Sequence, residues 1–212
     1  MKFIVKDLSK SFKKVKVVND VSIEFESGKI YGIMGRNGSG KSVFLKMLCS
    51  FYIPDSGTIT QDGYDYIKAN DFPKDTRALI ERAEFSPDLT GYENLKMLAK
   101  IQNKISDKEI EKALKDVNLY DEKDKKFSNY SYGMKQKLGI AQTIMENPKC
   151  IILDEPFNGI EAESVKKIKK ILKKLKEEGA IIIITSHIKE DVYELADEIY
   201  EFDNGSLSAY ER

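Results

Sequence analysis

Residues 35–42 constrain the fold more than any other part of this 212-residue chain. They read G-R-N-G-S-G-K-S, a full match to the pattern G-x-x-x-x-G-K-[ST]. An apolar run at residues 30–34 comes directly before them, and an apolar-rich segment at residues 43–48 follows. A strand that turns through a glycine-rich loop into a helix lets backbone N–H groups and the helix N-terminus converge on a phosphate. The sequence therefore predicts an α/β fold built around a phosphate-binding loop.

A second strand ends in two acidic residues. Residues 150–153 read C-I-I-L, too short for a helix and too apolar for a surface strand, so we expect them inside a parallel sheet. Asp154 and Glu155 follow at the carboxyl end, the edge where open α/β sheets bind their ligands. Lys41 can reach phosphate oxygens, and Ser42 and Asp154 offer oxygen ligands of the kind that Mg²⁺ prefers. Together these residues predict a site for a nucleoside triphosphate with magnesium.

The order of the motifs resembles that of the ATP-binding cassette (ABC) ATPases that drive membrane transporters. Residues 130–134, Y-S-Y-G-M, look like the L-S-G-G-Q signature of that family, just upstream of the strand with the acids. Residues 157–161 look like its D-loop, and residues 185–187, T-S-H, look like the segment that carries its switch histidine. The resemblance covers essentially the whole chain. The signature is more specific than the phosphate loop, which many NTPase classes share.

The resemblance implies a P-loop NTPase of the ABC type, with a mixed or parallel sheet core and an N-terminal antiparallel β-subdomain. It implies one ATPase domain over residues 1–212, with a helical subdomain at about residues 83–142. Three catalytic residues follow from it. Glu155 would polarise the attacking water, while Lys41 and His187 would stabilise the charge that develops on the γ-phosphate. Taken without the resemblance, a lone histidine such as His187 is more often a satisfied surface or core residue.

The resemblance also implies which residues hold ATP and Mg²⁺. The ATP contacts would come from an aromatic ring that stacks on adenine, from the phosphate loop, and from the signature of a second subunit. They are Phe12, Gly35, Asn37, Gly38, Ser39, Gly40, Lys41, Ser42, Val43, Ser131 and Gly133. The metal ligands would be Ser42, Asp154 and Glu81. An alternative interpretation makes Phe12 an ordinary core aromatic.

Three residues depart from the family pattern. Glu81 stands where the Q-loop glutamine is expected, and it adds a negative charge that glutamine would not. Tyr132 replaces the first signature glycine, although Ser131 and Gly133 keep the groups that would bind phosphate. Glu161 replaces the D-loop aspartate, and its longer reach puts the contact across a subunit interface in question.

Composition limits the partners and the location. The 35 Lys and Arg balance the 35 Asp and Glu, so no net charge recruits nucleic acid. No run approaches the ~20 apolar residues that span a bilayer, and the first residues lack a signal-peptide pattern. Cys49 and Cys150 fall in apolar stretches, which is typical of buried thiols in a reducing cytosol. We expect a cytoplasmic protein, peripheral on the inner face of the cell membrane.

The resemblance implies two partners: a second ATPase subunit, arranged head to tail as a homodimer, and a membrane-spanning permease. Residues 79–81, Phe85 and residues 89–95 look like the branch that exports bacterial peptides or confers immunity to them. Two alternatives remain open. One is a non-transport relative that acts on nucleic acid, although the chain lacks a long coiled coil, a second cassette and a basic surplus. The other is a nucleotide-binding regulator with impaired turnover, caused by the three departures from the pattern.

The remaining pattern predicts the other elements. Strands are expected at residues 3–5, 15–18, 21–25, 58–60, 78–80 and 181–185, helices at residues 92–104, from 106, from 131 and at 163–178, and hairpin turns at residues 62–63 and 204–205. The helix at residues 163–178 is rich in lysine. Its apolar residues 165, 168, 171, 172 and 175 form one stripe, which favours a solvated lysine face over a membrane-binding patch.

Overall fold

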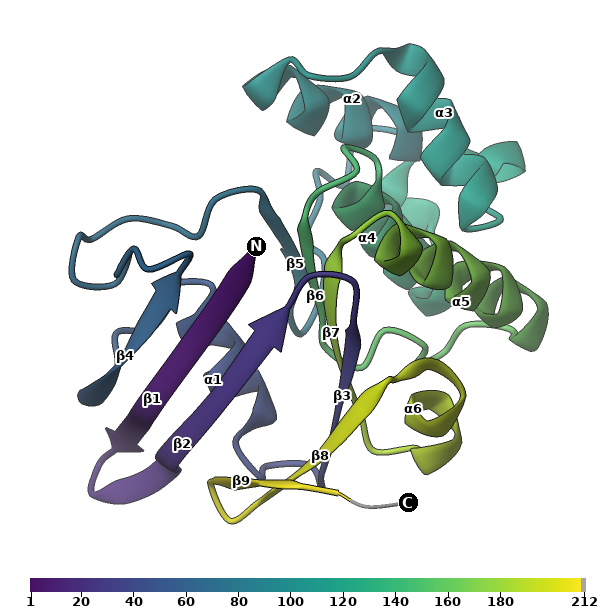
Figure 1. Ribbon diagram of the computed structural model, residues 1–212. Coiled ribbons are helices and arrows are strands. Elements are labelled where there is room, and N and C mark those ends of the chain that lie inside the picture. The colour runs from purple at the N-terminus through teal and green to yellow at the C-terminus, as the bar shows by residue number, and fades with distance from the viewer. Residues whose placement is uncertain (211–212) are drawn as a thin grey trace.

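The chain forms two β-sheets with helices packed against them (Figure 1). The structure is a computed structural model that describes residues 1–210. The smaller sheet is antiparallel, in the order β2-β1-β4, and consists of β1 (Lys2–Phe12), β2 (Val15–Glu26) and β4 (Ser56–Gln61). The larger sheet has the order β5-β6-β7-β3-β8-β9, and consists of β5 (Thr76–Leu79), β6 (Cys150–Leu153), β7 (Ile181–Ser186), β3 (Ile30–Met34), β8 (Glu198–Asp203) and β9 (Ser206–Ala209). Only β9 pairs antiparallel in the larger sheet as described, so the predicted fold class is confirmed.

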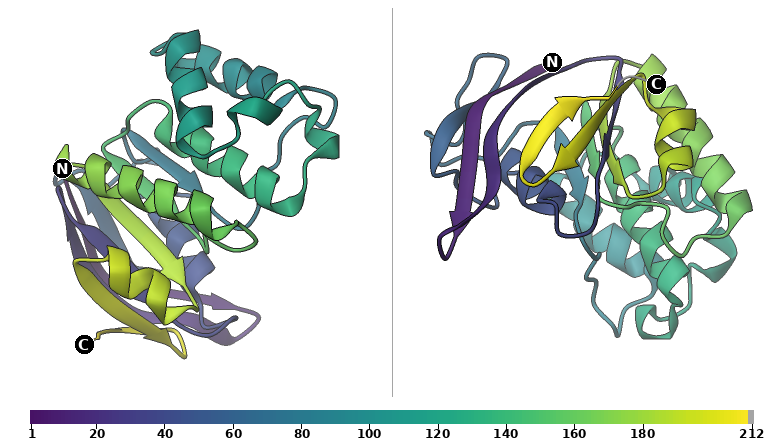
Figure 2. Two further views of the ribbon diagram at one scale, coloured as in Figure 1. Left: turned by 90° about the vertical axis from the view of Figure 1, so that its right-hand side faces the viewer. Right: turned by 90° about the horizontal axis from the view of Figure 1, so that it is seen from below.

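The helices occupy three places. Helix α1 (Lys41–Leu48) lies between the two sheets (Figure 1). On the opposite face of the larger sheet lie α4 (Tyr132–Ile144), α5 (Ala162–Glu177) and α6 (Lys189–Leu195), and Figure 2 shows α5 and α6 side by side on that face. Beyond α4 lie α2 (Gly91–Gln102), α3 (Asp107–Asp116) and the short turns η1 (Tyr120–Glu122) and η2 (Phe127–Asn129). No helix within residues 1–210 is long and apolar enough to cross a membrane.

Both faces of the larger sheet are covered, which explains its continuous apolar strands. In β6, Ile151 and Leu153 belong to the core with α4 and α5, whereas Cys150 and Ile152 belong to the core with α1. All four are buried, and burial of each large apolar side chain contributes about 1.5–3 kcal/mol. Cys49 is also buried, and both thiols are free, as the sequence predicts.

Most predicted helices are confirmed, with their caps. Ser106 and Glu109 form the predicted capping box at the start of α3, and Ser131 caps α4. The apolar stripe of α5 is also confirmed, since Ile168 and Leu172 are fully buried while the helix carries lysines on its other side. The division that makes residues 83–142 a helical subdomain remains a prediction.

One predicted turn is confirmed and one pair of strands is wrong. At the hairpin turn expected at residues 62–63, Gln61 and Tyr64 exchange two backbone hydrogen bonds of 2.9 Å across Asp62 (φ 50°) and Gly63 (φ 82°), although residue 64 forms only an isolated bridge. The strands expected at residues 15–18 and 21–25 are one strand, β2. Asp20 does not break it, because its left-handed backbone (φ 54°) and its N–H bond to the Ser9 hydroxyl form part of a bulge.

Gly32 in β3 marks where α6 touches the sheet. A Cβ atom at this position would lie 2.2 Å from Val192 Cγ1 and 3.0 Å from Ala196 Cβ. We predict that Gly32→Ala destabilises the fold by about 1–3 kcal/mol, the usual cost of overpacking. Urea denaturation measures this. The double variant Gly32→Ala/Val192→Ala should lose less than the sum of the two single losses, and strict additivity would contradict the proposed collision.

Candidate ATP site

Three parallel strands end at the predicted site, on one edge of the larger sheet. The phosphate loop follows β3, Asp154 and Glu155 follow β6, and His187 follows β7. Because β3 pairs with β7 and β7 with β6, all three carboxyl ends lie together. A cavity of about 280 Å³ opens there, lined by Val17, Asn37, Gly38, Gly40, Lys41, Ser42, Val43, Asp154 and Glu155. Seven of the predicted ATP and metal residues thus share one cavity with Glu155.

The phosphate loop approaches other backbone too closely for side chains. Gly35 and Gly40 have φ angles of 155° and 113°. A Cβ atom at Gly35 would lie 2.3 Å from the Phe202 carbonyl oxygen, and one at Gly40 would lie 2.4 Å from the Val17 carbonyl oxygen. Glycine is therefore needed at both positions for this loop to close against β2 and β8.

Lys41 lies inside the loop, with only 5% of its surface exposed. Its ammonium group donates to the carbonyl oxygens of Gly35 (2.7 Å) and Arg36 (3.0 Å), and lies 4.0 Å from Glu155 Oε1. Burial lowers the pKa of Lys41, while Glu155 and Asp154 act in the opposite direction. The lysine charge is thus compensated by short contacts inside the cavity.

Asp154 is held by two hydroxyl groups. Ser42 Oγ donates to its Oδ2 at 2.6 Å, and Thr185 Oγ1 donates to its Oδ1 at 2.5 Å. The described residues contain no cluster of three or more His, Cys, Asp or Glu that would form a metal cage. Mg²⁺ is usually bound by one or two carboxylates together with substrate phosphates and water, so the oxygens of Ser42 and Asp154 fit this metal.

Glu155 combines an unusual backbone with a free acceptor. Its φ angle is 48°, a conformation that few residues other than glycine adopt. Its Oε2 lies 2.7 Å from Nδ1 of His187, whose side chain is partly exposed, while its Oε1 is buried with no hydrogen-bond partner. A buried acceptor without a partner is costly, so this oxygen is suited to accept a proton or hydrogen bond from a ligand.

Six of the predicted ATP and metal residues do not line this cavity: Phe12, Gly35, Ser39, Glu81, Ser131 and Gly133. Phe12 is 40% exposed, which argues against a core aromatic, and its ring packs edge to face on Tyr52 with centroids 5.5 Å apart. The Glu81 carboxylate pairs with the Lys46 ammonium at 2.5 Å, on α1. The roles of Phe12 in adenine stacking and of Glu81 in metal binding remain predictions.

The signature lies against the D-loop of the same chain. Ser131 is exposed at the start of α4, and its hydroxyl accepts from the Met134 N–H at 3.3 Å. The Tyr132 ring covers Gly159, where a Cβ atom would lie 2.4 Å from Tyr132 Cδ1. A Cβ atom at Gly133 would lie 2.3 Å from the Gly159 carbonyl oxygen. Neither Ser131 nor Gly133 lines the phosphate cavity of its own chain.

Comparison with known proteins agrees with this geometry. The profile of the family described as ABC transporter matches residues 18–158. The bacitracin transport ATP-binding protein BcrA of Enterococcus faecalis is 40% identical over 211 residues, covering 98% of this chain and 68% of that protein. The lantibiotic transport ATP-binding protein SrtF of Streptococcus pyogenes is 33% identical over 196 residues, covering 91% and 83%. A solved ATP-binding subunit of an ABC transporter superposes with a TM-score of 0.89 at 25% identity, covering 99% and 90%.

The chain belongs to the ABC transporter family. It is accordingly an ATP-binding ATPase subunit that powers a membrane transporter, as the sequence predicts.

In this ABC subunit Glu161, the acid of the predicted D-loop, bonds within its own chain. Glu161 Oε1 accepts from Lys137 Nζ (2.8 Å) and from Ser164 Oγ (2.6 Å). These bonds, that to Lys137 first, lower the pKa of Glu161 to about 2. The Glu161 carboxylate therefore links α4 to α5 within one chain. This explains why a contact of Glu161 across a subunit interface is in question.

Sequence reasoning missed several partners in the site. Thr185 stands inside the recognised T-S-H segment, and Lys137 follows the signature on the same helix. A hydroxyl at the end of a strand, beside a strand that ends in an acid, is a usable signal. Gln136 donates to the Glu155 and Pro156 carbonyl oxygens at 3.3 Å each, which ties α4 to the turn after β6. The residues that touch Glu81 and Phe12, Lys46 and Tyr52, gave no local signal, because both contacts join segments far apart in sequence.

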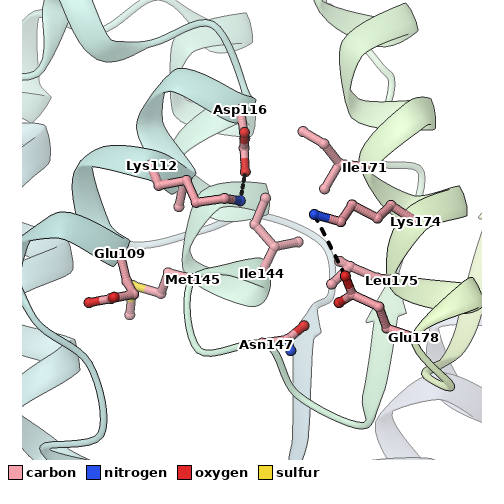
Figure 3. A pocket seen from close by; sticks show the side chains of 11 residues that line it. Glu109, Lys112, Asp116, Ile144, Met145, Asn147, Ile171, Lys174, Leu175 and Glu178 are labelled. Carbon is pink, nitrogen blue, oxygen red and sulfur yellow. Dashed lines mark hydrogen bonds and ion pairs between the residues drawn. The ribbon is translucent and has the colours of Figure 1, made fainter.

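A second cavity in the ABC subunit is unrelated to the phosphate loop. It measures about 370 Å³ and lies between α3, the end of α4 and α5, with Ile144, Met145 and Leu175 among its lining (Figure 3). The charged side chains at its rim pair with each other, Lys112 with Asp116 and Lys174 with Glu178. These lysines are already neutralised, so the cavity has no feature that favours a nucleotide.

The lowered pKa of Glu161 predicts a pH-dependent stability. An acid with a depressed pKa stabilises the folded state fully above its ordinary pKa of 4.5, and loses that contribution as the pH falls toward about 2. Glu161 is half-exposed, so we expect Glu161→Gln to cost no more than ~1 kcal/mol near pH 7. Urea denaturation of both proteins between pH 7 and pH 3 should show this difference shrinking below pH 4.5. A difference that stays constant with pH contradicts the assignment; the control Glu163→Gln, on the exposed side of α5, should match the parent near pH 7.

Proposed function

We propose that this ABC ATPase acts as a head-to-tail dimer that closes on ATP and opens after hydrolysis. One observation carries the proposal: the signature residue Ser131 is exposed and does not line the phosphate cavity of its own chain. It can therefore serve a nucleotide only if that nucleotide is bound to another subunit. The dimer would combine the phosphate loop of one chain with Ser131 and Gly133 of the next, which makes a homodimer the simplest assembly.

The residues around the cavity support distinct roles. The free Oε1 of Glu155 would take a proton from the attacking water, and the His187 bond to Oε2 would orient this carboxylate. Lys41 would exchange its two loop carbonyls for phosphate oxygens and stabilise their charge. Ser42 and Asp154 would hold Mg²⁺, which neutralises charge on the phosphates when bound. His187, at the edge of the site, would also contact the γ-phosphate.

We place the permease contact next to the segment that follows Glu81. A cavity of about 440 Å³ opens there, lined by Arg82, Ala83, Glu84, Phe85, Pro87, Phe127, Tyr132, Lys135 and Gln136. Its wall includes both this segment and the signature helix α4, so a permease segment bound there would touch the element that reaches the second nucleotide. A subunit bound to a permease in this way would be peripheral on the cytoplasmic face of the membrane.

The transported substrate is proposed from relatives alone. Relatives named for bacitracin transport and for lantibiotic transport align over nearly the whole chain. This supports a role in the export of bacterial peptides or in self-protection against them. The nucleic-acid alternative lacks support, because the charges of the chain balance.

The alternative of a regulator without turnover is the second candidate. The observation in its favour is that the Glu81 carboxylate binds Lys46, whereas the Ser42 hydroxyl binds Asp154. Against it, Lys41, Asp154 and Glu155 share one cavity. Phosphate release from the purified chain with the permease, and its loss in Lys41→Ala, would decide for the ATPase; equal release from both proteins would remove Lys41 from the mechanism.

Replacement of Glu155 by glutamine should separate binding from hydrolysis. Glu155→Gln keeps the shape of the side chain but removes the base, so we predict a loss of turnover of ~10²–10⁴-fold with ATP affinity at least equal to the parent. The bound ATP should then hold a closed dimer. Size-exclusion chromatography with ATP and Mg²⁺ measures the dimer, and phosphate release measures turnover.

The matched control for this experiment is Asp154→Asn. It changes the neighbouring acid by the same chemistry, and we expect it to weaken magnesium-dependent binding and to form no such dimer. A Glu155→Gln protein that stays monomeric and hydrolyses ATP at the parent rate would refute the head-to-tail mechanism for this chain.

A further inference from the structure

One face of α1 holds two acids from neighbouring strands. Ser42 and Lys46 lie four residues apart, one turn along the same side of the helix. The Ser42 hydroxyl binds Asp154 at 2.6 Å, and the Lys46 ammonium binds Glu81 at 2.5 Å. Asp154 follows β6 and Glu81 follows β5, and these strands pair in register, Leu79 opposite Leu153. The contact to Glu81 is therefore the next one along the helix from the proposed magnesium site.

Lys46 is held on two sides. Its ammonium group lies 5.4 Å from the centroid of the Tyr52 ring, in addition to its bond with Glu81. The Tyr52 ring in turn packs against Phe12. The hydrogen bond to Glu81 raises the pKa of Lys46, so the lysine stays charged. A fixed ammonium group at this place competes with any other cation for the same carboxylate.

Glu81 is itself placed unusually. Its φ angle is 62°, in the left-handed region, and its side chain is 60% exposed. Within the described residues, the Lys46 ammonium is the group that holds its carboxylate by a hydrogen bond and ion pair. A carboxylate at the end of the strand next to that of Asp154 would add a negative charge beside the magnesium site unless another cation neutralised it. A glutamine at this position would carry no charge, so it would form an ion pair with neither Lys46 nor Mg²⁺.

We propose that Lys46 is a positioning residue that holds Glu81 on α1 and thereby sets how strongly Mg²⁺ binds at the ATP site. The inference rests on the proposed magnesium role of Ser42 and Asp154. Glu81 can move toward the metal only by breaking its ion pair with Lys46. The free energy of that ion pair therefore lowers the affinity of the site for Mg²⁺. Partly exposed ion pairs contribute about 0.2–1 kcal/mol, which corresponds to a change of up to about fivefold in binding.

The test compares nucleotide affinity with and without Mg²⁺. The probe is the non-hydrolysable ATP analogue AMP-PNP, titrated calorimetrically in excess Mg²⁺ and in EDTA. The ratio of the two affinities is the magnesium enhancement, and it does not depend on turnover. Lys46→Met keeps an apolar stem beside Tyr52 and removes the ammonium group. We expect its enhancement to rise about two- to fivefold above the parent value, whereas Lys46→Arg should stay near the parent.

Two controls separate positioning from a general loss of charge. In the Glu81→Gln background, Lys46→Met should leave the enhancement unchanged, because the residue that it positions is gone. Lys10 is a matched control: it pairs with Asp55 at 2.8 Å and lies 5.6 Å from the Phe12 ring centroid, but binds no acid of the magnesium site. Lys10→Met should therefore shift both affinities by the same factor and leave their ratio unchanged.

The outcomes are distinguishable. An unchanged or lower enhancement in Lys46→Met, or the same rise in the Glu81→Gln background, overturns the role of Lys46. If Asp154→Asn does not reduce the magnesium enhancement seen in the parent, the proposed magnesium site itself is overturned, and this inference with it. Far-UV circular dichroism and the urea midpoint of Lys46→Met show that the variant is folded when its affinities are compared.

Discussion

The hydrogen bond between the Ser42 hydroxyl and the Asp154 carboxylate joins residues 112 positions apart in the chain. It forms only because β3, β7 and β6 run parallel and in register, so that a glycine-rich loop and an acidic turn end at the same edge. Thr185, from the strand between them, completes the arrangement by binding the other oxygen of Asp154. The paired strands thus fix the distance between the N-terminus of α1 and the Asp154 carboxylate.

This edge concentrates charge in a small, largely buried space. Lys41 is almost fully buried beside Asp154 and Glu155, and burial of charges costs several kcal/mol per ion unless each finds partners. The partners come from backbone carbonyls for the lysine and from hydroxyl groups for Asp154. Glu155 Oε1 and, in the phosphate loop, Ser39 Oγ are buried without a hydrogen-bond partner. Interactions in such surroundings are stronger than in water, which suits a site that must act on the charge of phosphates.

The sequence predicts the parts of this molecule that depend on local pattern. The strand-loop-helix around residues 35–42, the capping box at Ser106 and the buried strand before Asp154 were all predictable, because each needs particular residues at fixed spacing. The partners of Glu81 and Phe12 were not, since both contacts depend on how α1 and the segment after it pack against β1 and β5. The single strand β2 was not predicted for the same reason, because its pairing with β1 continues through the bulge at Asp20.

The contact between Tyr132 and Gly159 bears on how mutations in this chain combine. Gly159 has a φ angle of 72° and no room for a Cβ atom beneath the tyrosine ring. A side chain at position 159 would therefore force the exposed Tyr132 ring to move, so the departure of Tyr132 from the signature pattern cannot be judged alone. Positions 132 and 159 are therefore epistatic: the residue tolerated in the signature depends on the residue present in the D-loop. Variants that restore glycine at position 132 would change which D-loop sequences the chain accepts.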